Sequence, residues 1–306
     1  MKPTAPRSRA TLLRVALLAN AAFSLVTGSG LLFFASGLAP MIGAEVAPVI
    51  LAVIGGLLLP FGAFTGWLGT RPAPDTLLAL LISLADLGWV LGSGLLLVLA
   101  SGQLTSQGIA LVVVIAALVL GFALGQLRGI GTAFAADARD RARFRVCFEF
   151  TGGGDPREIW GNLANFGEVA RFAPTLASSR LRDGEEPAEG AIRDCADLAN
   201  RRWSERCTVL NHQTRELSLE FLTREPGFPF PFLEMTGGWS VRTESDRTVV
   251  RVWWEGLPKF PLLNPVILPL LAHQAKSQFP VMVRRMGLSG SRSVAGGPAL
   301  LALAPC

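Results

Sequence analysis

The sequence predicts an all-α unit of four transmembrane helices, followed by an α+β unit in which a curved antiparallel sheet surrounds a long C-terminal helix. Three observations support this. Only Glu45, Asp75 and Asp86 among the 23 acidic residues precede residue 136, so the two halves suit different solvents. The first half holds four long apolar stretches, and the second alternates apolar and polar residues. A proline-interrupted apolar run from Phe260 ends as an amphipathic helix.

The membrane unit begins after a short cytoplasmic tail, residues 1–10. Apolar stretches at about 11–35, 47–68, 76–99 and 107–127 can each supply the roughly 20 helical residues that cross a bilayer. A secretory signal peptide is the alternative for the first stretch, but its apolar run is too long and three further stretches follow. We therefore expect four transmembrane helices over residues 11–128.

Lys and Arg in the short flanks predict the orientation of these helices. Lys2, Arg7 and Arg9 precede the first stretch, Arg71 separates the second from the third, and Arg128 follows the fourth. The loops after the first and third stretches contain neither residue type. Both termini are therefore expected in the cytoplasm, in a multi-pass protein of the cell (inner) membrane. Arg outnumbers Lys 25 to 3, which is typical of a GC-rich bacterial genome.

Asp86 is the one acidic residue deep in an apolar stretch. A carboxylate inside a membrane is costly and raises the hypothesis of a proton relay, an ion site or a contact with a lipid headgroup. The alternative is a protonated or hydrogen-bonded Asp86 that faces a polar partner such as Asn20. A small transporter gated by the second unit is a further hypothesis, and it depends on Asp86 alone.

A basic linker, residues 129–143, leads into the second unit. Its Arg-rich part is expected either to continue the helix or to form a connector, held near anionic headgroups. Residues 144–150, FRVCFEF, then alternate as a half-buried strand does. Asp155 and Pro156 predict the start of short helices, as N-cap and first helical residue. Five or six antiparallel strands are expected between residues 176 and 255. The final helix ends near residue 288, before a flexible tail at 289–306.

The order of these elements carries a resemblance. FRVCFEF, then DPREIWGNLANFGEVARFAP, WSERCTVLNHQTRELSLEF and GGWSVRTESDRTVVRVWWEG together resemble START-like (SRPBCC) domains of the polyketide cyclase/dehydrase and lipid-transport type, over residues 144–288. The resemblance implies a helix-grip fold with an apolar ligand held between the sheet and the C-terminal helix. It does not extend to the four apolar stretches.

The candidate cavity follows from strand alternation and from the helical spacing of the last helix. Pro269 and Pro280 predict a kinked or late-starting helix whose first turns gate the pocket. The residues expected to line the cavity are Phe148, Phe150, Trp203, Glu205, Phe221, Trp239, Trp254, Leu271, Ala275, Phe279 and Met282.

Catalytic candidates are few. No Ser-His-Asp, Cys-His or HExxH pattern is present, and His212 and His273 are expected at the surface. Glu205 and Asp194 are weak candidates for a base in an apolar pocket. The alternative for Glu205 is an ion pair at the sheet rim with Arg202, Arg206 or Arg251.

Residues 227–235, GFPFPFLEM, form an apolar, proline-rich segment that suits neither a strand nor a helix. We expect Phe228, Phe230 and Phe232 in an exposed loop that contacts the membrane.

The cysteine, histidine and charged residues argue against several classes of function. The four cysteines and two histidines have no metal-binding spacing, so we expect no metal and no cofactor. Acidic and basic residues alternate through the second half, which argues against nucleic-acid binding. The favoured hypothesis is a membrane-anchored protein that binds a lipid or another apolar small molecule. The alternative is a cyclase- or dehydratase-like enzyme that acts on a membrane-soluble substrate.

Overall fold

The structure is a computed structural model, and it describes residues 10–136, 140, 142–182 and 185–293. The chain divides into two compact units between Ala133 and Phe134. We call them the helical unit and the sheet unit and describe each by itself.

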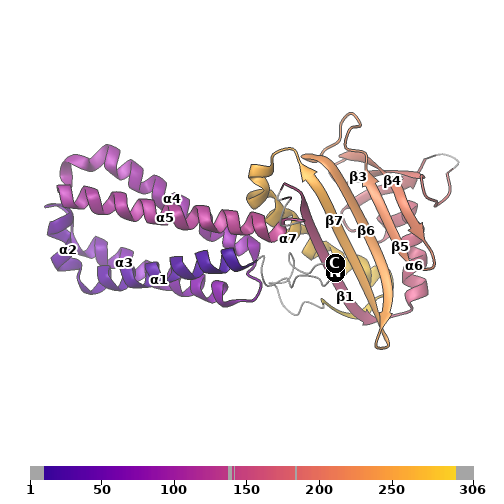
Figure 1. The fold of residues 1–306 in the computed structure, drawn as a ribbon, viewed down its shortest axis with the longest axis horizontal. Helices are drawn as coiled ribbons and strands as arrows, with labels where there is room; N and C mark the ends of the chain where they lie inside the picture. The colour runs from indigo at the N-terminus through magenta and orange to yellow at the C-terminus, as the bar shows by residue number, and fades with distance from the viewer. Residues whose placement is uncertain (1–9, 137–139, 141, 183–184, 294–306) are drawn as a thin grey trace. The chain divides into compact units, whose positions relative to one another are not determined.

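The helical unit contains four helices that are long and apolar enough to cross a membrane. Its elements are α1 (Thr11–Phe33), α2 (Ala35–Ile42), α3 (Pro48–Thr70), α4 (Thr76–Ala100), η2 (Ser101–Gln103) and α5 (Ser106–Phe134) (Figure 1). The first helix stops at Phe33, and α2 is an additional short helix. The predicted linker is wrong in part, because α5 continues through Phe134 rather than ending near residue 127.

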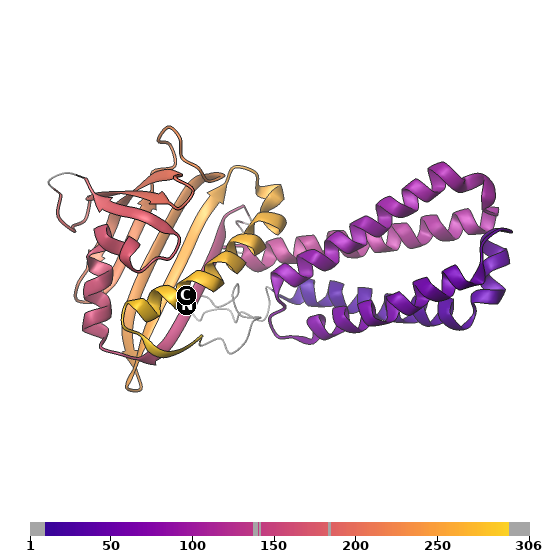
Figure 2. The same ribbon diagram turned by 180° about the vertical axis from the view of Figure 1, so that it is seen from behind.

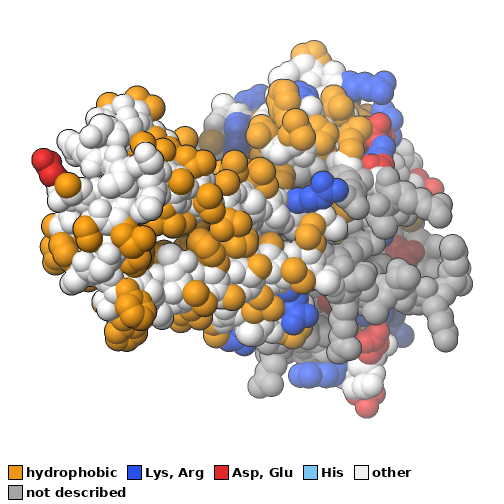
Figure 3. All heavy atoms as spheres, turned by 60° about the vertical axis from the view of Figure 1, so that its left-hand side comes forward, with side chains coloured by type: hydrophobic (Ala, Val, Ile, Leu, Met, Phe, Trp, Pro, Cys, Tyr) orange, Lys and Arg blue, Asp and Glu red, His pale blue; other side chains and the backbone are white. Residues whose placement is uncertain are grey.

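Helices α1 and α3 approach closely through glycines. A Cβ added at Gly55 would lie 2.6 Å from the Gly28 carbonyl oxygen, and one at Gly62 would lie 2.9 Å from Cγ of Leu25. Small residues allow such contact between helices in a membrane. Figure 3 shows hydrophobic side chains over much of the surface of the helical unit. Val26, Leu91 and Val98 are each more than 70% exposed, as expected of side chains that face lipid.

The sheet unit is an eight-stranded antiparallel sheet in the order β2-β3-β4-β5-β6-β7-β1-β8. Consecutive strands from β2 to β7 form a meander, and β1 pairs with β7. The strands are β1 (Phe144–Gly153), β2 (Leu176–Leu181), β3 (Ile192–Asp197), β4 (Arg202–Asn211), β5 (Glu216–Phe221), β6 (Phe232–Glu244), β7 (Arg247–Pro258) and β8 (Ser289–Ser293).

Strand β8 corrects the predicted tail. Ser289–Ser293 pairs with the outer edge of β1, with Ser293 opposite Phe150. The polar sequence SGSRS has no apolar alternation, and its partner is the free backbone edge of β1, which side-chain patterns do not reveal. Residues 294–306 of the predicted tail lie outside the described residues.

Helices α6 (Pro156–Ala164), η3 (Phe166–Arg171), η4 (Pro261–Leu263) and α7 (Asn264–Arg285) complete this unit. The Asp155 carboxylate accepts a hydrogen bond from the Arg157 amide at 2.8 Å, which confirms the predicted N-cap of α6. Figure 2 shows α7, in yellow, lying across one face of the sheet. The sheet surrounds this helix, as the sequence predicted.

The strand register determines which side chains face α7. Phe148 lies opposite Val252, and Val252 lies opposite Trp239 on its other side. Val146 lies opposite Trp254 in the same way. Directly paired residues project from the same face of an antiparallel sheet, so these side chains share the face on which α7 packs. We call it the concave face.

Candidate ligand-binding site

Phe279 of α7 is seated among three aromatic side chains of the concave face. Its ring centroid lies 5.3 Å from that of Phe148, 5.4 Å from Trp239 and 5.1 Å from Trp254. Phe148, Trp239 and Phe279 are buried. The four rings come from strands β1, β6 and β7 and from α7, so they join the helix to the sheet in the geometry that aromatic pairs prefer.

Other predicted lining residues belong to the same interior, with one correction. Phe150, Ala275 and Met282 are buried. Leu271 is only partly buried, whereas Leu268 and Ala272 are 0% and 2% exposed. Residues 266–272 are continuously apolar, so spacing alone could not select the buried stripe in the first half of the helix.

Three predicted aromatics on the sheet remain partly exposed: Trp203, Phe221 and Trp254. The indole of Trp254 lies over Gly237, where an added Cβ would be 2.8 Å from Cδ1 of Trp254 and 3.5 Å from Cε2 of Phe221. Glycine at position 237 therefore leaves the space that the indole occupies. These three rings belong to strands of the concave face, and each keeps part of its surface exposed.

A buried ion pair lies on the same face. Arg193 of β3 donates hydrogen bonds from Nη2 and Nε to Oε2 of Glu205 on β4, at 2.6 and 3.0 Å. Trp203 donates its indole N–H to Oε1 of Glu205 at 2.6 Å, and Arg193 Nη1 donates to the Phe166 carbonyl oxygen at 2.8 Å. Arg193 and Glu205 are 7% and 3% exposed. These hydrogen bonds offset the desolvation cost of burying both charged groups.

The electrostatics of this pair extend to a thiol. Burial alone would lower the pKa of Arg193, but the Glu205 carboxylate outweighs it and holds that pKa above its ordinary value. Burial, followed by the Glu205 charge, raises the pKa of Cys195 to about 12. The buried thiol of Cys195 is therefore protonated and unreactive.

Glu205 is on the predicted face, but the predicted ion-pair partners are wrong. Arg251 pairs with Glu149 at 2.9 Å, and Arg206 approaches Glu220 at 3.7 Å. The partner is Arg193, which pattern reasoning missed. The sequence did contain an indication of this pairing. Arg193 and Glu205 are equally far from the turn at Ala199, so a hairpin of β3 and β4 places them opposite each other.

Asp194 lies on the other face of the sheet, so its prediction as a cavity base is wrong. It accepts hydrogen bonds from Ser204 at 2.7 Å and from Arg182 at 3.1 Å. Burial would raise the pKa of Asp194, but the hydrogen bond from Arg182, with that from Ser204, holds it below its ordinary value. Adjacent strand residues project to opposite faces, so Asp194 cannot share the interior with Arg193. On that face it lines an open groove of about 630 Å³ together with Arg180, Arg202 and Ser204.

The phenylalanine segment is more buried than predicted. Phe232 begins β6, is 3% exposed and packs on Phe144 with ring centroids 5.3 Å apart. Its prediction as a membrane contact is therefore wrong. Phe228 and Phe230 are partly buried, and Phe230 packs edge-on against Trp203 at 5.2 Å. Because strand β6 begins at Phe232, the end of this segment is held against the sheet.

The histidines are both exposed. Nδ1 of His212 accepts a hydrogen bond from the Trp160 indole at 3.2 Å, which ties α6 to the β4–β5 turn. Within the described part of the chain, no group of three or more His, Cys, Asp or Glu side chains has the geometry to hold a metal ion.

The helical unit contains its own buried polar network. Asn20 of α1 and Gln126 of α5 donate hydrogen bonds to Oδ2 of Asp86 on α4, at 2.7 and 3.1 Å. Ser83 donates to Gln126 at 2.8 Å, and Ser24 donates to Asn20 at 3.2 Å. The partner expected for Asp86, Asn20, is therefore present. The network joins three helices through polar side chains, which is how buried polar groups in membrane proteins are satisfied.

Comparison with known proteins identifies the second half of the chain. Residues 141–286 match the family described as polyketide cyclase / dehydrase and lipid transport. The chain thus carries a domain of this SRPBCC type, preceded by four long apolar helices. No curated protein matches the chain significantly.

Solved structures with distant similarity include an uncharacterised protein from Bacillus thuringiensis, at 17% identity over 46% of this chain and 98% of that one, with a TM-score of 0.37. A norcoclaurine synthase mutant from Thalictrum flavum, in complex with a transition-state analogue, is 13% identical in sequence, with a TM-score of 0.38. The match covers 46% of this chain and 91% of the synthase chain. Ginseng major latex-like protein 151 from Panax ginseng is 12% identical, with a TM-score of 0.33. The match covers 43% of this chain and 97% of the ginseng protein.

Proposed function

We propose that this SRPBCC domain holds an apolar small molecule or lipid against its concave face, and that the four apolar helices keep the domain at a membrane. The observation that carries the proposal is the composition of the concave face. It combines aromatic surface at Trp203, Phe221 and Trp254 with one buried charged pair, Arg193 and Glu205. The aromatic surface suits the apolar body of a ligand, and the pair suits one polar group.

The polar end of the ligand is best matched by a hydroxyl or carbonyl group. Trp203, one of the three partly exposed rings, donates a hydrogen bond from its indole N–H to the Glu205 carboxylate. A ligand hydroxyl that replaced this donor would keep Glu205 satisfied, which burial of a charge requires. Arg193 would offer a donor to a ligand carbonyl in the same way.

Binding is better supported than catalysis. A general base needs a free oxygen within hydrogen-bond reach of the proton that it removes. Oε2 of Glu205 accepts two bonds from Arg193, and Oε1 accepts one from Trp203. The other catalytic candidate, Asp194, faces away from Glu205. An ion pair held in this way orients a ligand rather than transferring a proton.

Entry of a ligand is expected to involve α7. Pro269 and Pro280 lie inside this helix and cannot donate backbone hydrogen bonds, and no side chain caps its first turn. Because backbone hydrogen bonds are missing at these points, the first turns of α7 can shift without breaking a complete set of helical hydrogen bonds. Movement of Phe279 away from Phe148, Trp239 and Trp254 would open apolar space beneath the helix.

The test is native mass spectrometry, with organic extraction, of the full chain purified in a mild detergent. We expect a bound apolar molecule at a stoichiometry near one. Because the apolar helices also retain lipid, the comparison is with Phe221→Ser, which should lose that molecule, and with Leu198→Ser. Leu198 is 72% exposed beyond the end of β3 and serves as the matched control. Equal retention of the molecule by all three proteins would refute binding at the concave face.

The same proposal sets the topology. Both termini and the SRPBCC domain lie on the cytoplasmic side, because Lys and Arg gather in the flanks assigned to that side. A green fluorescent protein fused after residue 306 should fluoresce, and alkaline phosphatase fused at the same point should be inactive. The reverse pattern would invert the topology.

A further inference from the structure

The start of the C-terminal helix exposes a large apolar surface. Phe260, Leu262 and Leu263, at and around η4, are 59%, 94% and 48% exposed. Val266 and Leu270, in the first turns of α7, are 37% and 52% exposed. We call these five residues the apolar patch. Single exposed apolar residues are ordinary on a protein surface, but five within eleven positions indicate an interaction site.

The apolar character is confined to one end of the helix. Leu263, Val266 and Leu270 follow three- and four-residue steps, so they lie along one stripe. The same stripe continues with His273 and Ser277, which are exposed and polar. The outward face of α7 therefore changes from apolar to polar after its second turn. A helix with one end in an apolar medium has this distribution.

The charged residues of the segment that carries the patch are all basic. Residues 259–285 contain Lys259, Lys276, Arg284 and Arg285 and no acidic residue. A segment that combines exposed Leu and Phe with Lys and Arg complements an anionic lipid surface, through apolar burial and through attraction to the headgroups.

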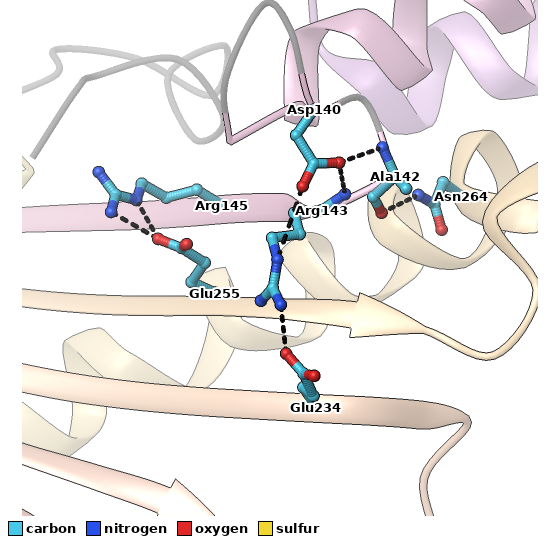
Figure 4. A network of polar contacts seen from close by, with 7 residues as sticks. All are labelled: Asp140, Ala142, Arg143, Arg145, Glu234, Glu255 and Asn264. Carbon is cyan, nitrogen blue, oxygen red and sulfur yellow. Dashed lines mark hydrogen bonds and ion pairs between the residues drawn. The ribbon is translucent and has the colours of Figure 1, made fainter.

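The chain enters the sheet unit beside the patch. Ala135 forms a β-bridge with Phe144, and the Ala136 amide donates to the Arg143 carbonyl oxygen at 2.9 Å. The neighbouring carbonyl oxygen, that of Ala142, accepts a hydrogen bond from Asn264, the first residue of α7, at 3.4 Å (Figure 4). The beginning of α7 is thus close to the first residues that follow α5.

The covalent connection between the apolar stretch of α5 and this end of the domain is short. The apolar stretch of α5 ends near Leu127, and seven further helical residues reach Phe134. At about 1.5 Å per residue they rise roughly 10 Å, which is comparable with the thickness of one headgroup layer. Arg143, bonded to Glu234 and Asp140, then fixes the entering strand to the sheet (Figure 4).

We propose that the apolar patch inserts into the boundary between headgroups and acyl chains of the bilayer that holds the helical unit. The first turns of α7 would then contact lipid directly, so a ligand could pass between the membrane and the concave face without crossing water. This passage rests on the proposed function. The insertion itself does not, and its test measures depth rather than a ligand, so either proposal can fail alone.

The experiment places a nitroxide spin label at position 262 through Leu262→Cys, in a chain that also carries Cys306→Ser. Leu262 is 94% exposed, so labelling there leaves the core intact. The full chain is reconstituted in nanodiscs of phosphatidylcholine and phosphatidylglycerol at three to one. Power-saturation spectra compare accessibility to oxygen, which concentrates in lipid, and to a water-soluble nickel chelate. Leu198→Cys is the matched exposed control, and the chain without an introduced cysteine gives the background.

We expect the label at position 262 to be accessible to oxygen and shielded from nickel, and the label at position 198 to behave oppositely. Nickel accessibility equal to that at position 198 would show that the patch faces water and would overturn the proposal. Shielding from both reagents would show that protein covers the patch, either a second copy or the helical unit, and would overturn it equally.

Discussion

Arg193 and Glu205 face each other across β3 and β4, with Nη2 of Arg193 2.6 Å from Oε2 of Glu205 and both side chains almost wholly buried. Removing two charges from water costs several kcal/mol each, so such a pair adds little net stability over apolar residues of the same volume. Its presence in an aromatic interior supports a role in recognition.

Removal of one partner should be far more damaging than replacement of both. We expect Glu205→Leu to cost about 3–5 kcal/mol, because it leaves the Arg193 guanidinium buried without its counterion. The double variant Arg193→Met/Glu205→Leu should recover most of this loss and should bind the ligand less well. Thermal unfolding of the full chain in detergent measures the first effect, and native mass spectrometry measures the second. A double variant as unstable as Glu205→Leu would contradict this account.

Gly237→Ala should disturb the accessible aromatic surface. Its new Cβ would lie 2.8 Å from Cδ1 and 3.1 Å from Nε1 of Trp254, so the indole must shift. Overpacking of this kind costs about 1–3 kcal/mol. Gly161→Ala is the control, because no atom lies within 4 Å of its added Cβ and alanine favours the helix α6. The unfolding midpoint should fall for the first variant only.

Stability should decrease in acid partly through Glu149. Burial alone would raise the pKa of Glu149, but hydrogen bonds from Arg242 and Arg251 outweigh it and hold that pKa below its ordinary value. The stabilisation is therefore complete above the unfolded pKa of about 4.3 and is lost as pH falls through the lower folded value.

The measurement compares thermal midpoints of the wild type and Glu149→Gln at pH 7 and pH 3. We expect the wild type to be more stable at pH 7 and the difference to shrink at pH 3. Glu186→Gln, at an exposed position, serves as the control. A difference between wild type and Glu149→Gln that did not depend on pH would exclude Glu149 as a source of acid sensitivity.

Asp86 should stabilise the helical unit through hydrogen bonds. Asp86→Leu leaves the amide groups of Asn20 and Gln126 without their acceptor, and we expect a loss of about 1–2 kcal/mol. Asp86→Asn keeps an acceptor oxygen and should lose less. Unfolding of the full chain in detergent ranks the three proteins. If Asp86→Asn proved as damaging as Asp86→Leu, the negative charge itself would be essential, which would favour the hypothesis of an ion or proton site.

Much of the architecture could be predicted from local patterns. Continuous apolar stretches identified the four long helices, and the alternation of Phe144, Val146, Phe148 and Phe150 identified β1. Asp155 and Pro156 identified the start of α6. Each feature depends on residues close together in the sequence, so periodicity and capping rules were sufficient.

The site could be predicted only in part, because it depends on register. Strand parity placed Glu205 on the interior face, but its partner depends on how β3 aligns with β4. Phe232 was expected to be exposed, since its proline-rich surroundings gave no sign that β6 begins there and packs it on Phe144. The apolar patch was overlooked because the whole start of α7 is apolar, and composition cannot tell which residues remain uncovered.

By itself, the sequence determined the division into a half with four long apolar helices and an α+β half, the order of the elements and the family resemblance of residues 144–288. Hydropathy and periodicity are local properties, so they can be read from the sequence alone. Tertiary structure decided that Arg193 neutralises Glu205, that Asp194 faces away from it, and that Leu262 and its neighbours lie open. These facts follow from strand pairing and from the seating of α7 on the sheet. The physical reason is that burial and ion pairing depend on contacts between residues distant in the chain, which only the folded molecule brings together.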